Sequence, residues 1–150
     1  MTLIQTLTAP IEESALPAGH GAYALLIRLP HRLQASIGAL GMIGLPAGAY
    51  LYLGSAHGPG GLRARLRRHL RPEKTRHWHV DYLTEVGKII CILAVPDGHE
   101  CDLVDRARSC TGVSVPIAGF GSSDCRRCPA HLLSVERDAE SVLATLAGRS

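Results

Sequence analysis

Aromatic residues are scarce in this chain of 150 residues, which contains one Trp, one Phe and four Tyr. Aliphatic side chains must therefore supply most of the core, and the length suits one compact domain. We find no internal repeat, and no linker long enough to divide the chain. Because tyrosines are so few, the position of each one is informative.

Long apolar runs are also absent, since no stretch reaches the roughly 18 residues that a membrane-spanning helix needs. The N-terminal segment lacks the basic region and following apolar run of a secretory signal. We therefore expect a cytoplasmic protein without a membrane partner. In that compartment cysteines indicate thiols or metal ligands before disulfides. The five cysteines are Cys91, Cys101, Cys110, Cys125 and Cys128.

Positive charge is concentrated in one segment, although the net charge is only +3. Between Arg63 and Arg76 lie seven Arg or Lys residues and one acid, Glu73, whereas the rest of the chain has nine basic and twelve acidic residues. A cationic segment on a slightly acidic body is typical of a polyanion-binding face. The alternative is a solvated helix face, which would normally alternate acids with bases.

The apolar patterns predict an α+β fold, with a small antiparallel or mixed three-stranded sheet, an extra hairpin and flanking helices. We expect an extended N-terminal arm over residues 1–18, followed by a single domain over residues 19–150. The expected core strands are 21–29, 48–54 and 88–95, and the hairpin is 34–47. The expected helices are 61–70, 77–86, 97–110 and 134–146.

The expected helix 61–70 combines a leucine stripe at four-residue spacing with basic residues on both sides. Arg65 and His69 are four residues apart, so their side chains lie next to each other at one border of the stripe. We expect Arg65 to point toward the sheet. Three arginines at the other border are expected to face a ligand backbone: Arg63, Arg67 and Arg71. Alternatively, the arginine stems simply cover apolar surface.

Backbone groups and a carboxylate add two further candidates. The Gly60-Gly61 start of this helix is expected to leave N–H groups free to bind an anion. Glu100 lies near the middle of the apolar face of the expected helix 97–110, where an unpaired charge would be costly and a divalent cation would satisfy it. Alternatively, Asp97 and Glu100 form a capping box at the helix start.

Two tripeptides, Gly21-Ala22-Tyr23 and Tyr52-Leu53-Gly54, resemble the motifs of the GIY-YIG nucleases. Arg65, eleven residues after Gly54, matches the essential arginine of that superfamily, and His69 matches a frequent histidine four residues later. Glu100 matches the metal-binding glutamate. The chain departs from the pattern at Ala22, where Ile is usual, and in the longer spacing between the tyrosines that the extra hairpin causes.

Three longer segments resemble the Uri-type branch of these nucleases, and with them the resemblance covers roughly residues 19–133. They run from Tyr50 to Ala56, from His77 to Tyr82 and from Gly119 to Cys125.

The resemblance implies a metal-dependent endonuclease that hydrolyses phosphodiester bonds, and we expect its nucleic acid to be DNA rather than RNA. Its catalytic residues would be Tyr23, Tyr52, Arg65, His69 and Glu100. One Mg²⁺ or Mn²⁺ ion on Glu100 would stabilise charge at the phosphate, and Arg65 would bind the transition state. The tyrosines would orient water, with Tyr23 as the favoured base, and His69 would transfer a proton or bind phosphate.

Other readings of the same residues stay open. The tyrosines alternatively pack in an ordinary sheet with their hydroxyls at its edge. The alternative function is a non-catalytic nucleic-acid-binding module that uses the basic helix. In either case, the predicted nucleic-acid contacts are Arg63, Arg67, Arg68 and His79. His79 alternatively packs beside Leu83, and Trp78 is available to stack on a base.

Cys125, Cys128 and His131 are spaced as three zinc ligands, with Cys110 or Cys101 as a fourth. A structural zinc ion is the less favoured interpretation, because the second pair of a standard zinc site is missing. Buried thiols, or a disulfide after oxidation, fit the spacing equally well. A zinc-bearing adaptor is accordingly a third candidate function.

Overall fold

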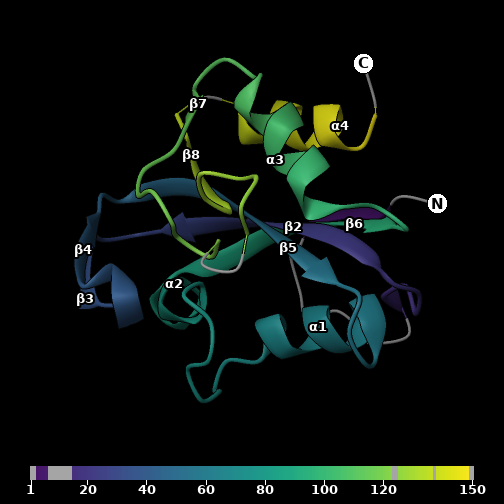
Figure 1. Ribbon diagram of the computed structural model, residues 1–150, viewed down its shortest axis with the longest axis horizontal. Helices are drawn as coiled ribbons and strands as arrows, with labels where there is room; N and C mark the ends of the chain where they lie inside the picture. The colour runs from purple at the N-terminus through teal and green to yellow at the C-terminus, as the bar shows by residue number, and fades with distance from the viewer. Residues whose placement is uncertain (1–2, 7–14, 123–124, 137, 149–150) are drawn as a thin grey trace.

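The computed structural model describes residues 3–6, 15–122, 125–136 and 138–148. Within them the chain is α+β, with one six-stranded sheet, a separate two-stranded sheet and four α-helices (Figure 1). The α+β prediction is therefore confirmed. The helices are α1 (Gly61–Leu70), α2 (Asp81–Val86), α3 (Glu100–Arg108) and α4 (Ala139–Leu146).

The large sheet has the strand order β1-β6-β2-β5-β8-β7, and every pair is antiparallel. Its central strands are β2 (Gly21–Leu29), β5 (Gly48–Ala56) and β6 (Lys88–Pro96). Its outer strands are β1 (Leu3–Thr6), β7 (Val113–Ser114) and β8 (Leu132–Val135). The expected three-stranded sheet is thus wrong in number: all three predicted strands are present, and three shorter strands extend them on both sides.

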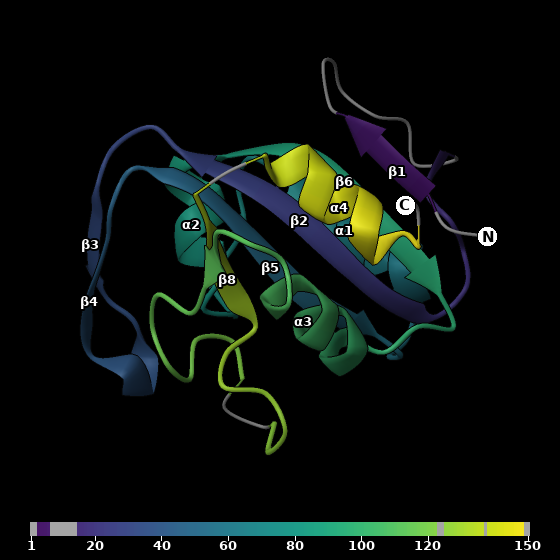
Figure 2. The ribbon, with the colours of Figure 1, turned by 90° about the horizontal axis from the view of Figure 1, so that it is seen from above.

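The expected hairpin forms the second sheet, in which β3 (Leu33–Ser36) pairs with β4 (Met42–Leu45). A short 3-10 helix, η2 (Gly38–Leu40), joins the two strands. The hairpin extends beyond the ends of β2 and β5, away from α1 (Figure 2). It is a local insertion between two adjacent strands of the large sheet, so the pairing of β2 with β5 is preserved.

The helices cover the sheet on both faces, with α1 and α2 on one side and α3 and α4 on the other (Figure 1). Along β2, Tyr23, Leu25 and Ile27 pack with the α1–α2 side, whereas Ala22, Ala24 and Leu26 pack with the α3–α4 side. A central strand with helices on both faces is buried on both, which explains the continuous apolar run in its sequence.

Helix starts differ most from the predictions. The structure begins α2 at Asp81 rather than at residue 77. It begins α3 at Glu100, because Asp97 has a φ of 63° in the left-handed region and cannot open a helix. The N-cap of α3 is His99 without a side-chain cap, so the Asp97–Glu100 capping box is wrong.

The C-terminal element predicted as one helix over residues 134–146 is a strand followed by a helix. Ser134 and Val135 belong to β8, and α4 starts only after Asp138, whose carboxylate accepts a hydrogen bond from Ser141 N. At the other end of the chain, part of the expected arm is strand β1, which pairs with β6; residues 7–14 lie outside the described residues. No helix of the described residues is long and apolar enough to cross a membrane.

Candidate active site

A hollow of about 450 Å³ opens beside β5, where α1, the segment before α2 and the start of α3 meet. Among the residues of these elements that line it, five have side chains of chemical interest: Tyr52, Arg65, Trp78, His79 and Glu100. Four of the five appear among the residues that the sequence predicts for a site. The hollow is also lined by Gly121 and His131, from the loop that precedes β8.

Tyr23 and His69 lie together at the base of this region. The Tyr23 hydroxyl is 2.6 Å from His69 Nε2, and each residue is only 1% exposed. Both rings also contact Tyr52, with centroid distances of 6.3 Å from Tyr23 and 6.0 Å from His69. The three rings therefore form one connected group, of which Tyr52 alone lines the hollow.

Gly54 makes room for the Tyr23 ring. The two residues are cross-strand partners of β5 and β2, and a Cβ atom at position 54 would lie 2.2 Å from Tyr23 Cζ. No side chain larger than hydrogen fits without moving the tyrosine. The glycine of the second tripeptide is thus explained by a tyrosine of the first.

Burial controls the protonation of the three rings. It raises the pKa of Tyr23 well above its ordinary value, and Tyr52 adds to this whereas the Arg65 charge opposes it. Burial also raises the pKa of Tyr52 to about 12. For His69, burial lowers the pKa to about 3, although the Asp81 charge opposes that shift. His69 is consequently neutral at pH 7, so its Nε2 can accept a hydrogen bond from the Tyr23 hydroxyl.

Arg65 points toward the sheet, as its helix position predicts. Its Nη1 donates a hydrogen bond of 3.1 Å to Ser55 O, and its Cζ lies 4.3 Å from the centroid of the Trp78 ring. A guanidinium has five N–H donors in a rigid fork. The backbone bond and the ring contact therefore orient the group and leave donors for a ligand in the hollow.

Trp78 is occupied by protein groups. Besides Arg65, Arg68 lies with its Cζ 4.2 Å from the Trp78 centroid, and the His69 ring lies 5.6 Å away. The indole holds these side chains in place by cation–π and ring contacts. It is less available for the base stacking considered from the sequence.

Glu100 is the first residue of α3 and lies half-buried at the edge of the hollow. Its charge acts on both Tyr23 and Tyr52, whose pKa values it raises. Within the described residues, its carboxylate has no hydrogen bond or ion pair. The apolar face of α3 is formed by Leu103, Val104 and Ala107, and Glu100 lies one turn before them at the N-terminal end of the same helix.

Arg63 and Arg68, two of the four predicted nucleic-acid contacts, donate hydrogen bonds to protein oxygens. Arg63 donates from Nε and Nη2 to Leu16 O, at 3.0 and 2.8 Å. Arg68 donates to both carboxylate oxygens of Asp81, at 3.0 and 2.9 Å, and to Thr75 O. These bonds hold the chain around α1 and occupy donors that a phosphate would need.

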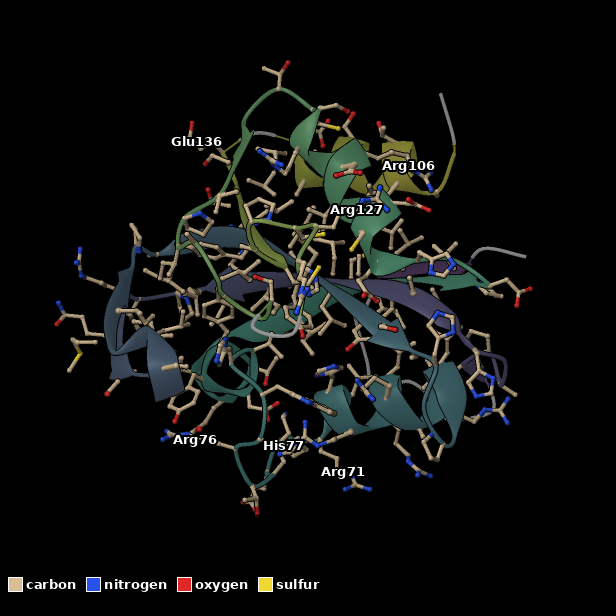
Figure 3. The ribbon with its side chains drawn as sticks, viewed as in Figure 1. Arg71, Arg76, His77, Arg106, Arg127 and Glu136 are labelled. Atoms are coloured by element: carbon tan, nitrogen blue, oxygen red, sulfur yellow. The ribbon has the colours of Figure 1, made fainter. Side chains whose placement is uncertain are left out.

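The other two predicted contacts differ from each other. Arg67 is exposed on α1. His79 is half-buried, and its Nδ1 accepts a hydrogen bond of 2.9 Å from Gly121 N. That bond joins the segment before α2 to the loop before β8 across the hollow. Figure 3 shows three further basic side chains, Arg71, Arg76 and His77, along the border of the molecule below α1 and α2.

The start of α1 does not offer the free amides that its glycines suggest. Gly61 N donates to Gly58 O at 3.1 Å, and Leu62 N donates to Gly19 O at 2.9 Å. Gly61 has a φ of 62°, and a Cβ on it would lie 2.5 Å from Gly19 O. The glycine pair therefore allows close packing against the segment before β2, and these two amides are not an anion site.

A second cluster lies beside the hollow and could hold a metal ion. One ligand atom from each of Cys101, Cys125, Cys128 and His131 lies within 4.8 Å of all the others. The structure thus selects Cys101 as the fourth member, and Cys110 instead contacts Arg106 O through its Sγ. The spacing of Cys125, Cys128 and His131 was the sequence signal for this cluster, and it did not distinguish Cys101 from Cys110 as the fourth member.

Comparison with known proteins gives one match. Residues 22–148 match a family model described as "Domain of unknown function DUF123". No curated protein matches the chain, and no solved structure matches it.

Proposed function

The chain belongs to the DUF123 family, and we propose that it is a metal-dependent endonuclease of the Uri-type GIY-YIG branch that hydrolyses phosphodiester bonds in DNA. One observation carries the proposal. The five residues assigned to catalysis lie on four different elements, and they gather around a single hollow: Tyr23, Tyr52, Arg65, His69 and Glu100.

Glu100 would hold the divalent cation. Mg²⁺ prefers oxygen ligands and commonly binds through one or two carboxylates together with substrate phosphate and water. A half-buried carboxylate at the edge of the hollow, with no partner among the residues that the structure describes, fits that requirement. When bound, Mg²⁺ or Mn²⁺ would stabilise negative charge on the scissile phosphate and the leaving oxygen.

Arg65 would bind the same phosphate from the opposite border. Ser55 O and the Trp78 ring already orient its guanidinium, so little rearrangement is needed when the substrate enters. Donors that are oriented in advance toward developing charge favour the transition state over the ground state. This role requires the forked geometry of arginine, which lysine lacks.

The tyrosines and His69 would manage the attacking water. Tyr52 lines the hollow and is placed to touch that water, whereas Tyr23 lies behind it against His69. When Tyr23 takes a proton from the water side, its own hydroxyl proton passes to His69 Nε2. The Arg65 charge lowers the pKa of Tyr23 and so favours loss of its proton. Burial and the Arg65 charge oppose the imidazolium at His69, and the Asp81 charge supports it.

Purified protein incubated with labelled single-stranded DNA, double-stranded DNA and RNA, with Mg²⁺, Mn²⁺ or a chelator, tests the proposal. We expect metal-dependent cleavage of DNA that falls at least about 100-fold in Arg65→Ala and in Glu100→Gln. Arg108→Ala serves as the matched control and should retain cleavage, because Arg108 is exposed at the end of α3 and does not line the hollow.

Two results would contradict the nuclease. Cleavage that is equal in all variants would indicate a contaminant. Salt-sensitive binding without cleavage, independent of metal, would instead favour the non-catalytic nucleic-acid-binding module. The concentration of arginine and lysine between residues 63 and 76 is what keeps this second function under consideration.

A further inference from the structure

The start of α3 and the loop before β8 bring three thiols and one imidazole together. Cys101 is the second residue of α3, Cys125 and Cys128 lie in the loop, and His131 immediately precedes β8. The Cys101 and Cys125 Sγ atoms are 3.6 Å apart. In a tetrahedral zinc site with Zn–S bonds of about 2.3 Å, sulfur atoms lie about 3.8 Å apart. The observed separation is already close to that value.

Burial of His131 points to a ligand at this cluster. His131 and Cys128 are each 7% exposed. The His131 Nε2 atom is buried and has no hydrogen-bond partner within the described residues. A buried polar nitrogen without a partner is costly, and coordination of the ring to a metal ion would explain its placement.

The chemistry of the four ligands favours zinc over the cation proposed for Glu100. Thiolate sulfur and imidazole nitrogen suit Zn²⁺, whereas Mg²⁺ prefers oxygen. All five cysteines are free thiols in the structure. A Cys101–Cys125 disulfide would use only half of the cluster and would leave Cys128 and His131 without a role.

Other contacts hold this loop against α3 only weakly. Arg127 lies beside α3 (Figure 3). It pairs with Asp102, at 3.1 Å, and with Asp105 on the exposed side of that helix. Such exposed ion pairs contribute little to stability. Cys128 N donates to Cys125 Sγ at 3.4 Å, which folds the loop back on its own first cysteine. A metal ion would be the strongest connection between the two segments.

We propose that Cys101, Cys125, Cys128 and His131 bind one structural zinc ion, and that this centre positions two borders of the active-site hollow. One border is Glu100, which directly precedes Cys101. The other border consists of Gly121 and His131, which both line the hollow. His131 O also accepts from Leu53 N, next to Tyr52. The proposed zinc site does not depend on the proposed nuclease function, whereas the proposed positioning of Glu100 rests on that function.

Metal analysis of the full chain, purified under reducing conditions, tests the zinc site. We expect about one zinc per chain, retained in Cys110→Ser and lost in Cys128→Ser. Because Cys128→Ser could fail to fold, the wild-type chain is also loaded with Co²⁺, which should give the thiolate charge-transfer and d–d absorption of a tetrahedral sulfur-rich site. Absence of zinc together with absence of these bands would overturn the site, as would a Cys101–Cys125 disulfide under reducing conditions.

Electron paramagnetic resonance of Mn²⁺ binding, measured without any substrate, tests whether the zinc centre positions Glu100. We expect zinc-loaded protein to bind Mn²⁺ about tenfold more tightly than folded protein stripped of zinc by a chelator, with Glu100→Gln losing the Mn²⁺ site and retaining zinc. Equal Mn²⁺ affinity with and without zinc would overturn the positioning. Zinc and Mn²⁺ binding without any DNA cleavage would contradict the proposed nuclease and leave both metal sites standing.

Discussion

The Tyr23 hydroxyl lies 2.6 Å from His69 Nε2, although the two residues are 46 positions apart in the sequence. Tyr23 is on central strand β2 and His69 is on α1, so the bond joins the sheet to the basic helix. Both groups are buried, and neither has access to water as a replacement partner. The pair therefore matters for stability as well as for the proposed chemistry, and the two roles can be separated.

Tyr23→Phe should destabilise the protein by about 1–3 kcal/mol, because it leaves His69 Nε2 buried without a partner. Urea unfolding measures this loss, and DNA cleavage should fall at the same time. Tyr50→Phe is the matched control, since its hydroxyl bonds Pro46 O outside the hollow. That variant should lose some stability and keep cleavage. Unchanged stability and cleavage in Tyr23→Phe would contradict the assignment.

His69 should make stability depend on pH. Its pKa is about 3 in the folded protein and 6.5 when unperturbed, so the unfolded chain binds a proton that the folded protein excludes between those values. The stabilisation is complete above pH 6.5 and decreases as the pH falls toward 3, by at most about 1.4 kcal/mol per pH unit.

Comparison of unfolding free energies at pH 7 and pH 5 for wild type and His69→Gln measures this contribution. The wild type should lose more stability than the variant. His79 and His131 also have a lowered pKa because of burial, so they contribute in the same direction in both proteins. Equal pH dependence in the two proteins would show that His69 is accessible to protons in the folded state.

Gly54→Ala should displace the Tyr23 ring and cost about 1–3 kcal/mol, because the new methyl group would overlap Tyr23 Cζ. Gly19→Ala is the control, since a Cβ there meets no atom within 4 Å. In a Tyr23→Ala background the additional cost of Gly54→Ala should largely disappear, which a double-mutant cycle measures. A fully additive cycle would argue against the contact.

Arg68→Ala should destabilise the protein by about 3 kcal/mol, because it leaves the Asp81 carboxylate, 1% exposed, without its ion-pair partner. Although burial opposes ionisation, bonds from Arg68 and from the Trp78 and His77 amides lower the Asp81 pKa to about 2. Arg76→Ala is the control, since its exposed pair with Glu85 is worth about 0–1 kcal/mol. Chemical unfolding compares the two variants, and equal costs would contradict this prediction.

Arg67→Ala should weaken DNA binding, because Arg67 is the exposed member of the predicted contacts on α1. Removal of one phosphate contact lowers the salt dependence of binding by about one unit in the log–log slope. Binding measured in a chelator at several salt concentrations tests this. An unchanged slope would remove Arg67 from the interface.

Whether a strand could be predicted from the sequence depended on how many residues it contains. The strands β2, β5 and β6 were predicted, because a strand buried on both faces shows a long apolar run between glycine and proline. The strands β1, β7 and β8 have four, two and four residues, too few to show a period. Ser134 and Val135 were assigned to a helix because the sequence does not reveal that Asp138 caps α4 from within the predicted span.

Local periodicity in the sequence by itself determined α1, the direction of Arg65 and the adjacency of Arg65 to His69, since a helix places residues four apart on one side. Only the tertiary structure decided that Tyr23 meets His69, that Arg68 pairs with Asp81, and that Cys101 rather than Cys110 joins the metal-ligand cluster. Those outcomes depend on distances between segments remote in the sequence, and the packing of α1 and α3 on opposite faces of the sheet sets them.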